Sequence, residues 1–84
     1  MNSKQRLTLQ RVFREPTPAD LRWNDVVSLL GALGADLEEA AGSRVTIRLK
    51  GVKLTLHRPH PTPVLKKSTV RAVADFLANA GVEA

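Results

Sequence analysis

AGSRVTIRLKGVKLTLHRPHPTP, residues 41–63, holds two short runs in which apolar and polar side chains alternate. The apolar positions of the two runs are Val45, Ile47, Leu49, Val52, Leu54 and Leu56. This period of two, together with the β-branched residues, predicts two half-buried strands at residues 44–49 and 52–57. The Lys50-Gly51 pair between the runs predicts a tight hairpin turn.

The other side of the predicted hairpin consists of side chains that are cationic or form hydrogen bonds. They are Arg44, Thr46, Arg48, Lys50, Lys53, Thr55 and His57. Successive strand residues point to opposite faces, so these side chains share one face and the apolar ones share the other. The apolar face is expected to meet the core, and the basic face is the candidate working surface.

The composition indicates one small domain. Its 84 residues, 43% of them hydrophobic, provide a single core of about two layers. No run approaches the roughly 18 apolar residues that a membrane span needs, so no membrane partner is expected. The lack of cysteine excludes a disulfide framework, a thiolate nucleophile and a cysteine zinc site, and it indicates a reduced, cytoplasmic setting.

Charge is distributed unevenly along the chain, whose net charge is +5. No carboxylate lies between Glu39 and Asp75. The same segment holds the cations Arg44, Arg48, Lys50, Lys53, Arg58, Lys66, Lys67 and Arg71. Clustered basic residues favour a polyanion as partner, first of all nucleic acid, because phosphates are common ligands of such a surface. The alternative is a solvated face that only keeps the protein in solution.

The first residues are basic and only loosely amphipathic. Residues 1–14 contain no acid, and they predict either a first helix capped by Ser3 or a basic arm. Residues 1–16 are therefore separated from a domain at residues 17–84. The stretch Thr17-Pro18-Ala19-Asp20 predicts a further helix start, because a capping hydroxyl, a proline and an acid follow in the order that suits one.

Two further segments have apolar residues at helical spacing. In residues 23–33 these are Val26, Leu29, Leu30 and Leu33. In the last segment they are Val70, Val73, Ala74 and Leu77. Both patterns predict amphipathic helices. Gly34 is suited to end the first helix, Ser68 is expected to cap the second, and Trp23 is expected to pack at the edge of the core.

Residues 35–41 are ambiguous and are interpreted as a short edge strand. The order helix, strand, strand, strand, helix predicts an α+β fold, a two-layer sandwich of the double-stranded-RNA-binding-domain type. In this fold the helices cover one face of a three-stranded antiparallel sheet. Lys66 and Lys67 precede the last helix, where cations oppose the helix dipole. A phosphate bound at this helix start is one explanation, and two exposed lysines without consequence are the other.

Several short stretches, taken in order, carry a family resemblance. They are Trp23 with Val26, Leu29, Leu30 and Leu33-Gly34, then Gly42-Ser43, Pro59-His60-Pro61, Leu65-Lys66-Lys67-Ser68-Thr69-Val70, Phe76-Leu77 and Ala80-Gly81-Val82. In this order and spacing the chain resembles the HicA family of bacterial toxins, small RNA-cleaving partners of HicB antitoxins. The resemblance implies the fold, binding of mRNA and a HicB-like antitoxin as partner. In the family a catalytic histidine typically follows Gly-Ser, and this chain has Arg44 there, so the resemblance does not by itself imply nuclease activity.

If the chain cleaves RNA, histidine is the residue type expected to act. Metal-free cleavage needs a base for the ribose 2′-OH, an acid for the leaving oxygen and cations for the phosphorane charge. His60 is predicted as the base, with His57 as a further candidate and Arg44 stabilising the transition state. The alternatives are a strand end for His57 and a hydrogen-bonded loop residue for His60. No metal or other cofactor is expected, because no third ligand accompanies the two histidines.

These observations leave three functions open. The first is a HicA-like toxin that binds mRNA on the basic hairpin face and at the start of the last helix, and that cleaves it if His60 acts. The second is a non-catalytic RNA-binding domain, and the third is a protein-interaction domain whose basic face docks an acidic partner such as an antitoxin. The residues predicted to hold phosphates are Arg44, Arg48, Lys50, Lys53, Arg58, Lys66 and Lys67.

Overall fold

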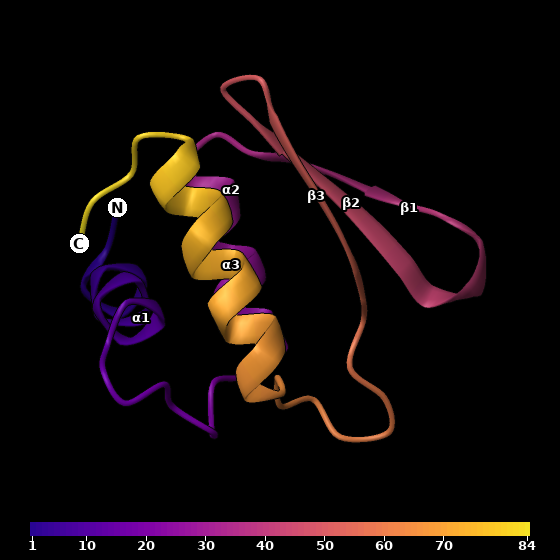
Figure 1. Cartoon of the computed structure of the whole chain (residues 1–84), viewed down its shortest axis with the longest axis horizontal. Coiled ribbons are helices and arrows are strands. Elements are labelled where there is room, and N and C mark those ends of the chain that lie inside the picture. The colour runs from indigo at the N-terminus through magenta and orange to yellow at the C-terminus, as the bar shows by residue number, and fades with distance from the viewer.

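The computed structural model describes all 84 residues as three helices and one three-stranded sheet. In chain order the elements are α1 (Ser3–Val12), α2 (Trp23–Ala32), β1 (Asp36–Glu39), the 3-10 turn η1 (Ala41–Ser43), β2 (Arg44–Leu49), β3 (Val52–His57) and α3 (Lys67–Asn79). The strands are antiparallel and lie in the order β1-β2-β3 (Figure 1). The predicted α+β class and the open antiparallel sheet are confirmed.

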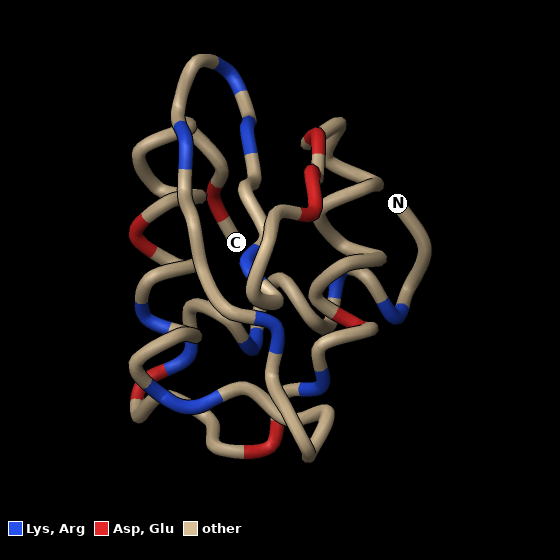
Figure 2. The backbone as a smooth tube through the Cα atoms, turned by 90° about the vertical axis from the view of Figure 1, so that its right-hand side faces the viewer, with Lys and Arg blue, Asp and Glu red and all other residues tan.

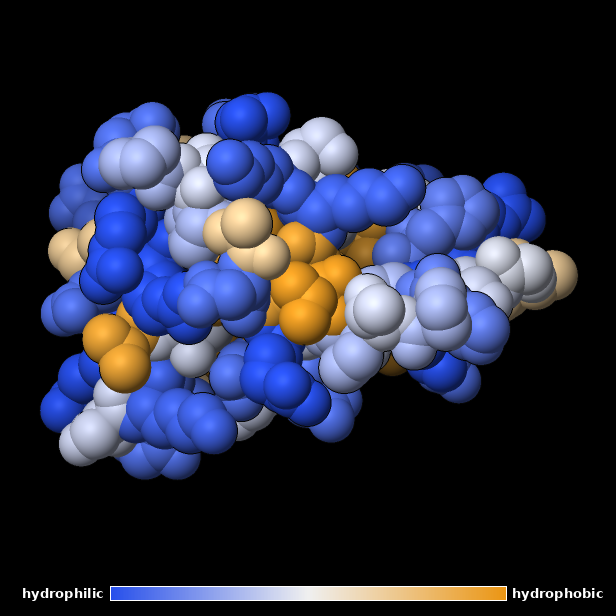
Figure 3. All heavy atoms as spheres, turned by 90° about the horizontal axis from the view of Figure 1, so that it is seen from below, coloured by the Kyte–Doolittle hydropathy of each residue, from blue (hydrophilic) through white to orange (hydrophobic).

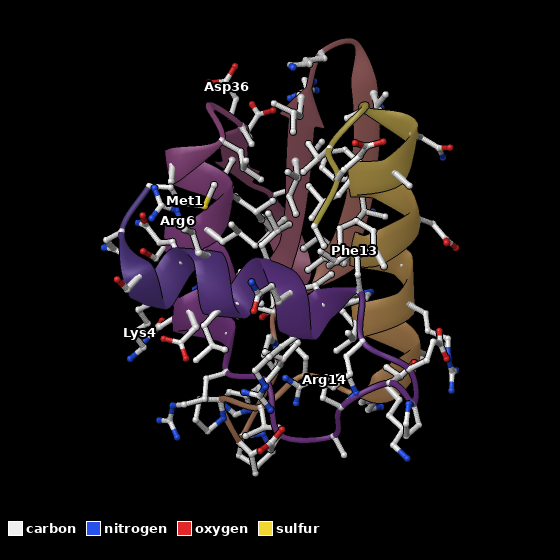
Figure 4. All side chains as sticks on the ribbon, turned by 90° about the vertical axis from the view of Figure 1, so that its left-hand side faces the viewer. Met1, Lys4, Arg6, Phe13, Arg14 and Asp36 are labelled. Carbon is white, nitrogen blue, oxygen red and sulfur yellow. The ribbon has the colours of Figure 1, made fainter.

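The helices lie on one side of the sheet. Figures 1 and 4 show α2 and α3 side by side against the sheet, with α1 crossing them on the side away from it. Leu30 of α2, Ile47 of β2 and Leu77 of α3 have no exposed surface, so the core lies between the sheet and this helix pair. The opposite face of the sheet carries no helix and stays open.

The hairpin has the turn and the two faces that its sequence predicts. Lys50 and Gly51 have φ values of 49° and 80°. A two-residue turn that matches the right-handed twist of its strands requires a positive φ at both central residues. The register places Arg48 opposite Lys53 and Arg44 opposite His57. These side chains are exposed, while the apolar residues between them are buried or half-buried.

Alanine substitution of two glycines, one in the hairpin turn and one inside α2 as its control, tests the backbone conformation of the turn. Gly51→Ala should lower the free energy of unfolding by about 1 kcal/mol, because a Cβ is strained at positive φ. Gly31→Ala, inside α2 with open space around it, should raise it by about 1 kcal/mol. Urea unfolding of both variants measures the two effects. Equal shifts in the same direction would contradict the turn geometry.

Within the ambiguous residues 35–41, Asp36–Glu39 form the edge strand β1, which pairs with β2 at Leu37 and Ile47. This pairing has a consequence that the sequence pattern did not indicate. Asp36 lies opposite Arg48 and Glu38 lies opposite Thr46, so both acids share the open face with the hairpin cations. The open face therefore carries cations on the hairpin and acids on β1.

Three predicted helix starts are wrong. The cap of α1 is Asn2 and not Ser3, because the Asn2 and Gln5 side chains each accept the other's backbone N–H, at 2.8 and 2.9 Å. No helix begins at Thr17. The chain there continues irregularly to Leu21, which is buried and whose carbonyl accepts the Leu65 N–H.

The third correction concerns the start of α3. Lys66, not Ser68, is the N-cap, and the helix begins at Lys67. Lys66 is extended, with φ −67° and ψ 152°, and its carbonyl accepts the N–H groups of Thr69 and Val70. Ser68 therefore lies inside the first turn and does not cap the helix.

Of the two alternatives predicted for residues 1–14, a helix or a basic arm, the structure has the helix, α1. Leu9 and Val12 of α1 belong to the same buried cluster as the residues of α2 and α3. The Gln5 side chain donates to the hydroxyl of Ser28 in α2 at 2.9 Å. The division between residues 1–16 and a domain at residues 17–84 stays a prediction.

Candidate nucleic-acid interface

A pocket of about 500 Å³ lies where β3 ends, the proline-rich loop turns and α3 begins. Its polar lining comes from His57, Arg58, His60, Thr62, Lys66, Ser68 and Thr69. Leu56, Val64 and Leu65 add an apolar lining. No carboxylate lines it, so its charge is positive. Figure 3 shows the molecule from this lower side, where hydrophobic atoms are visible in the middle of a mostly hydrophilic surface.

Backbone hydrogen bonds hold the loop that shapes this pocket. The Trp23 N–H donates to the Pro63 carbonyl at 2.7 Å, and the Leu65 N–H donates to the Leu21 carbonyl at 2.8 Å. At the other end of the loop the Arg58 N–H donates to the Ser43 carbonyl at 2.9 Å. The loop is thus fixed to the start of α2 and to η1, which restricts where His60 can lie.

The start of α3 adds backbone donors to the pocket. No side chain caps this helix, and the N–H groups of Lys67 and Ser68 have no backbone acceptor. The N-terminus of a helix carries partial positive charge, which favours an anion. Lys66 and the hydroxyls of Ser68 and Thr69 lie beside these groups in the pocket lining. The arrangement provides a phosphate with several donors and an adjacent cation.

The two histidines and Lys66 are brought together, as lining residues of one pocket. Arg44 is not part of that lining. It lies on the open sheet face opposite His57, and its Nε donates to the Ala41 carbonyl at 3.2 Å. The third residue predicted for catalysis therefore adjoins the pocket through His57 without lining it.

Arg58 connects the pocket to the acidic edge of the sheet. Its guanidinium forms an ion pair with Glu39 of β1, and both side chains are exposed. Exposed ion pairs contribute little to stability, about 0–1 kcal/mol, so a phosphate can compete for this arginine. Arg58 is consequently available to a ligand that enters the pocket.

The remaining predicted cations lie elsewhere. Arg48, Lys50 and Lys53 surround the hairpin tip, at the opposite end of β3 from the pocket. Arg48 pairs with Glu38 at 3.0 Å. Lys67 is the exposed first residue of α3 and does not line the pocket. The predicted phosphate ligands thus form two groups, not one.

Three polar pocket residues were missed by the sequence interpretation. Ser68 was assigned to a cap, and Thr62 and Thr69 were given no role, yet all three line the pocket. The signal was the run Lys66-Lys67-Ser68-Thr69 at a helix start, which combines cations with small donors. No three His, Cys, Asp or Glu side chains lie close enough to hold a metal ion, and no helix has the length and apolarity to cross a bilayer.

The model of one protein family matches residues 23–82, from the first residue of α2 to just beyond α3. It describes the HicA toxin of bacterial toxin–antitoxin systems. The chain belongs to the HicA toxin family. No curated protein and no solved structure matches it.

Membership in the HicA family gives the pocket a context. This HicA chain is a toxin of a toxin–antitoxin system, with an antitoxin as its partner. The matched residues include the sheet, the proline-rich loop and the start of α3, and therefore the whole pocket. Helix α1 lies before the matched region, although it packs against the matched helices.

Proposed function

We propose that this HicA-family toxin acts on mRNA, which it binds through phosphate contacts in the pocket and along the basic part of the sheet. The observation that carries the proposal is the pocket at the start of α3, where His57, Arg58, His60 and Lys66 meet without a carboxylate. The phosphate ligands are Arg44, Arg48, Lys50, Lys53, Arg58, Lys66 and Lys67. A setting in the cytoplasm, where mRNA is present, follows from this proposal.

Binding of this kind relies on the RNA backbone more than on the bases. The chain has three aromatic residues, and none lines the pocket. Trp23 and Phe76 are 9% and 3% exposed, so neither provides a platform for base stacking. Phosphate contacts release counterions, so affinity should fall steeply and linearly with the logarithm of salt concentration.

The same pocket contains groups suited to metal-independent cleavage. His60 is proposed as the base that removes the proton from a ribose 2′-OH, whose oxygen then attacks the adjacent phosphorus. His57 would protonate the departing 5′-oxygen. Lys66 and the free N–H groups of α3 would stabilise the phosphorane charge, with Arg44 beside His57. The position of His57, His60 and Lys66 in the lining of one pocket supports this assignment.

Incubation of purified protein with mRNA in EDTA tests the cleavage step. The unaltered protein should cleave the RNA, and His60→Ala should reduce the rate at least about 100-fold, because removal of a general base costs that much. Arg6→Gln, on helix α1 and away from the sheet (Figure 4), is the control and should cleave normally. Equal cleavage by His60→Ala and the control would exclude His60 as the base.

A non-catalytic RNA-binding function is the second candidate. The observation that favours it is Arg44, which occupies the position after Gly42-Ser43 and donates to the Ala41 carbonyl. An arginine stays protonated and does not act as a base near neutral pH. RNA that is bound by the unaltered protein but stays intact would establish this second function.

The antitoxin of this system is proposed to be HicB-like. The exposed cations at the pocket provide complementary charge for an acidic partner, and charge complementarity of this kind speeds association. An antitoxin docked there would cover His57 and His60 and so block RNA. Competition between a HicB-like protein and RNA for the toxin measures this overlap.

A further inference from the structure

The exposed basic residues of the open sheet face lie at the two ends of the hairpin, with Arg48, Lys50 and Lys53 at the tip and Arg44 opposite His57 at the other end. Lys53 lies near the hairpin tip and His57 lies in the pocket, four residues further along β3. At the usual rise of a strand, this separation is about 13 Å. A second, more open pocket of about 430 Å³ surrounds the tip. Its basic lining residues are Arg48, Lys50 and Lys53, and Asp36 of β1 lines it as well.

The surface between the two ends is polar and uncharged. Thr46 and Thr55 face each other across β2 and β3, with their hydroxyl oxygens 3.3 Å apart. Thr55 shares the open face with Lys53 and His57, because alternate residues of a strand point the same way, and all three are exposed. A continuous hydrogen-bonding strip therefore joins the tip to the pocket.

Acidic side chains border this strip on one side only. Asp36 and Glu38 lie on β1, two strands and about 10 Å from β3. In Figure 2 the hairpin carries basic positions (blue) at its upper end, and acidic positions (red) lie on a neighbouring segment. Glu38 neutralises Arg48, whereas Lys50 and Lys53 have no ion-pair partner. An anionic chain is thus repelled from β1 and attracted to the unpaired lysines of the hairpin tip.

We propose that the hairpin tip is a second phosphate-binding subsite, formed by Lys50 and Lys53, and that an RNA strand runs along β3 from the tip to the pocket. This inference rests on the proposed function, because it takes RNA as the ligand of the pocket. It adds the path of the RNA along β3 and a minimum length of RNA that reaches both subsites. RNA that is too short to reach the tip binds only in the pocket and gains no affinity from the tip. Longer RNA binds at both subsites at once and therefore binds more tightly.

The test compares two RNA lengths with matched charge changes. The ligands are a dinucleotide, measured by NMR titration, and an oligonucleotide of about ten nucleotides, within the usual footprint of single-strand binding domains. The tip variant is Lys50→Gln/Lys53→Gln. The control is Arg6→Gln/Arg14→Gln, which removes the same charge from α1 and the residues after it, away from the sheet (Figure 4). Lys66→Gln serves as the pocket variant.

The tip variant should bind the longer RNA about tenfold more weakly than the control and lower the salt slope by about 2, with dinucleotide binding unchanged. Asp36→Asn/Glu38→Gln should strengthen binding of the longer RNA, because the repulsion is removed and Arg48 is released. If the tip variant matches the control while Lys66→Gln weakens both ligands, the second subsite is refuted and the pocket stands. If the unaltered protein binds neither RNA, the proposed function fails, and this inference fails with it.

Discussion

Deletion of residues 1–16 is expected to leave a chain that is largely unfolded at room temperature. Helix α1 covers the outer sides of α2 and α3, and Leu9 and Val12 are 7% and 3% exposed. Burial of each such side chain contributes about 1.5–3 kcal/mol, and a small domain has a net stability of only about 5–15 kcal/mol. Deletion would also expose the apolar partners of α1. Circular dichroism and urea unfolding of the shortened chain measure the effect.

A pair of leucines on α1 separates packing from helix propensity. Leu9→Ala should lower the free energy of unfolding by about 3 kcal/mol, since it leaves a cavity in the core. Leu7→Ala should change it by less than about 0.5 kcal/mol, because Leu7 is 51% exposed. Equal effects of the two substitutions, or a deletion that folds normally, would show that residues 1–16 are an arm outside the domain.

Reversal of charge at the start of α3 is expected to abolish most RNA binding. In Lys66→Glu/Lys67→Glu, two phosphate contacts become repulsive, and each contact is equivalent to about 1 kcal/mol near physiological salt. The affinity should fall at least about 100-fold, and the salt slope by about 2. Fluorescence anisotropy with labelled RNA at several salt concentrations measures both quantities.

This variant has an internal control for folding. Acids at the start of a helix interact favourably with its dipole, so the double substitution should raise the stability of α3 slightly. Lys4→Glu/Arg6→Glu makes the same change of net charge on α1, away from the sheet (Figure 4), and should weaken binding by less than about fivefold. A more stable protein that has lost RNA binding identifies the helix start as the contact. Unchanged affinity in the α3 variant would remove it from the interface.

The local parts of this fold were predictable because short-range patterns determine them. The alternation of apolar and polar residues on both sides of Lys50-Gly51 predicted the hairpin, and the helical spacing of apolar residues in 23–33 predicted α2. The helix starts were less predictable. Thr17 and the residues after it have the sequence pattern of a helix N-cap. The chain nevertheless continues without a helical turn, because Leu21 is buried in the core. Ser68 failed as a cap because Lys66, placed by the hydrogen bond of its neighbour Leu65, already occupies the N-cap position.

The sequence predicted which residues form the candidate site better than it predicted how those residues are arranged. The absence of acids between Glu39 and Asp75 identified the basic residues, and the pocket does unite His57, His60 and Lys66. The acidic border was not foreseen, because it depends on the pairing of β1 with β2, a contact between residues distant in sequence. The register of β2 on β3 places Arg44 opposite His57 but outside the pocket.

The most direct test of the account is an NMR titration of isotope-labelled protein with an oligoribonucleotide, followed through backbone amide shifts. The histidine substitutions His57→Ala and His60→Ala keep cleavage from obscuring the spectra. The account predicts the largest shifts at residues 57–69, around the pocket, and weaker shifts along β3 to the hairpin tip. Shifts centred on α1 or on the acidic strand β1, or no shifts at all, would contradict it.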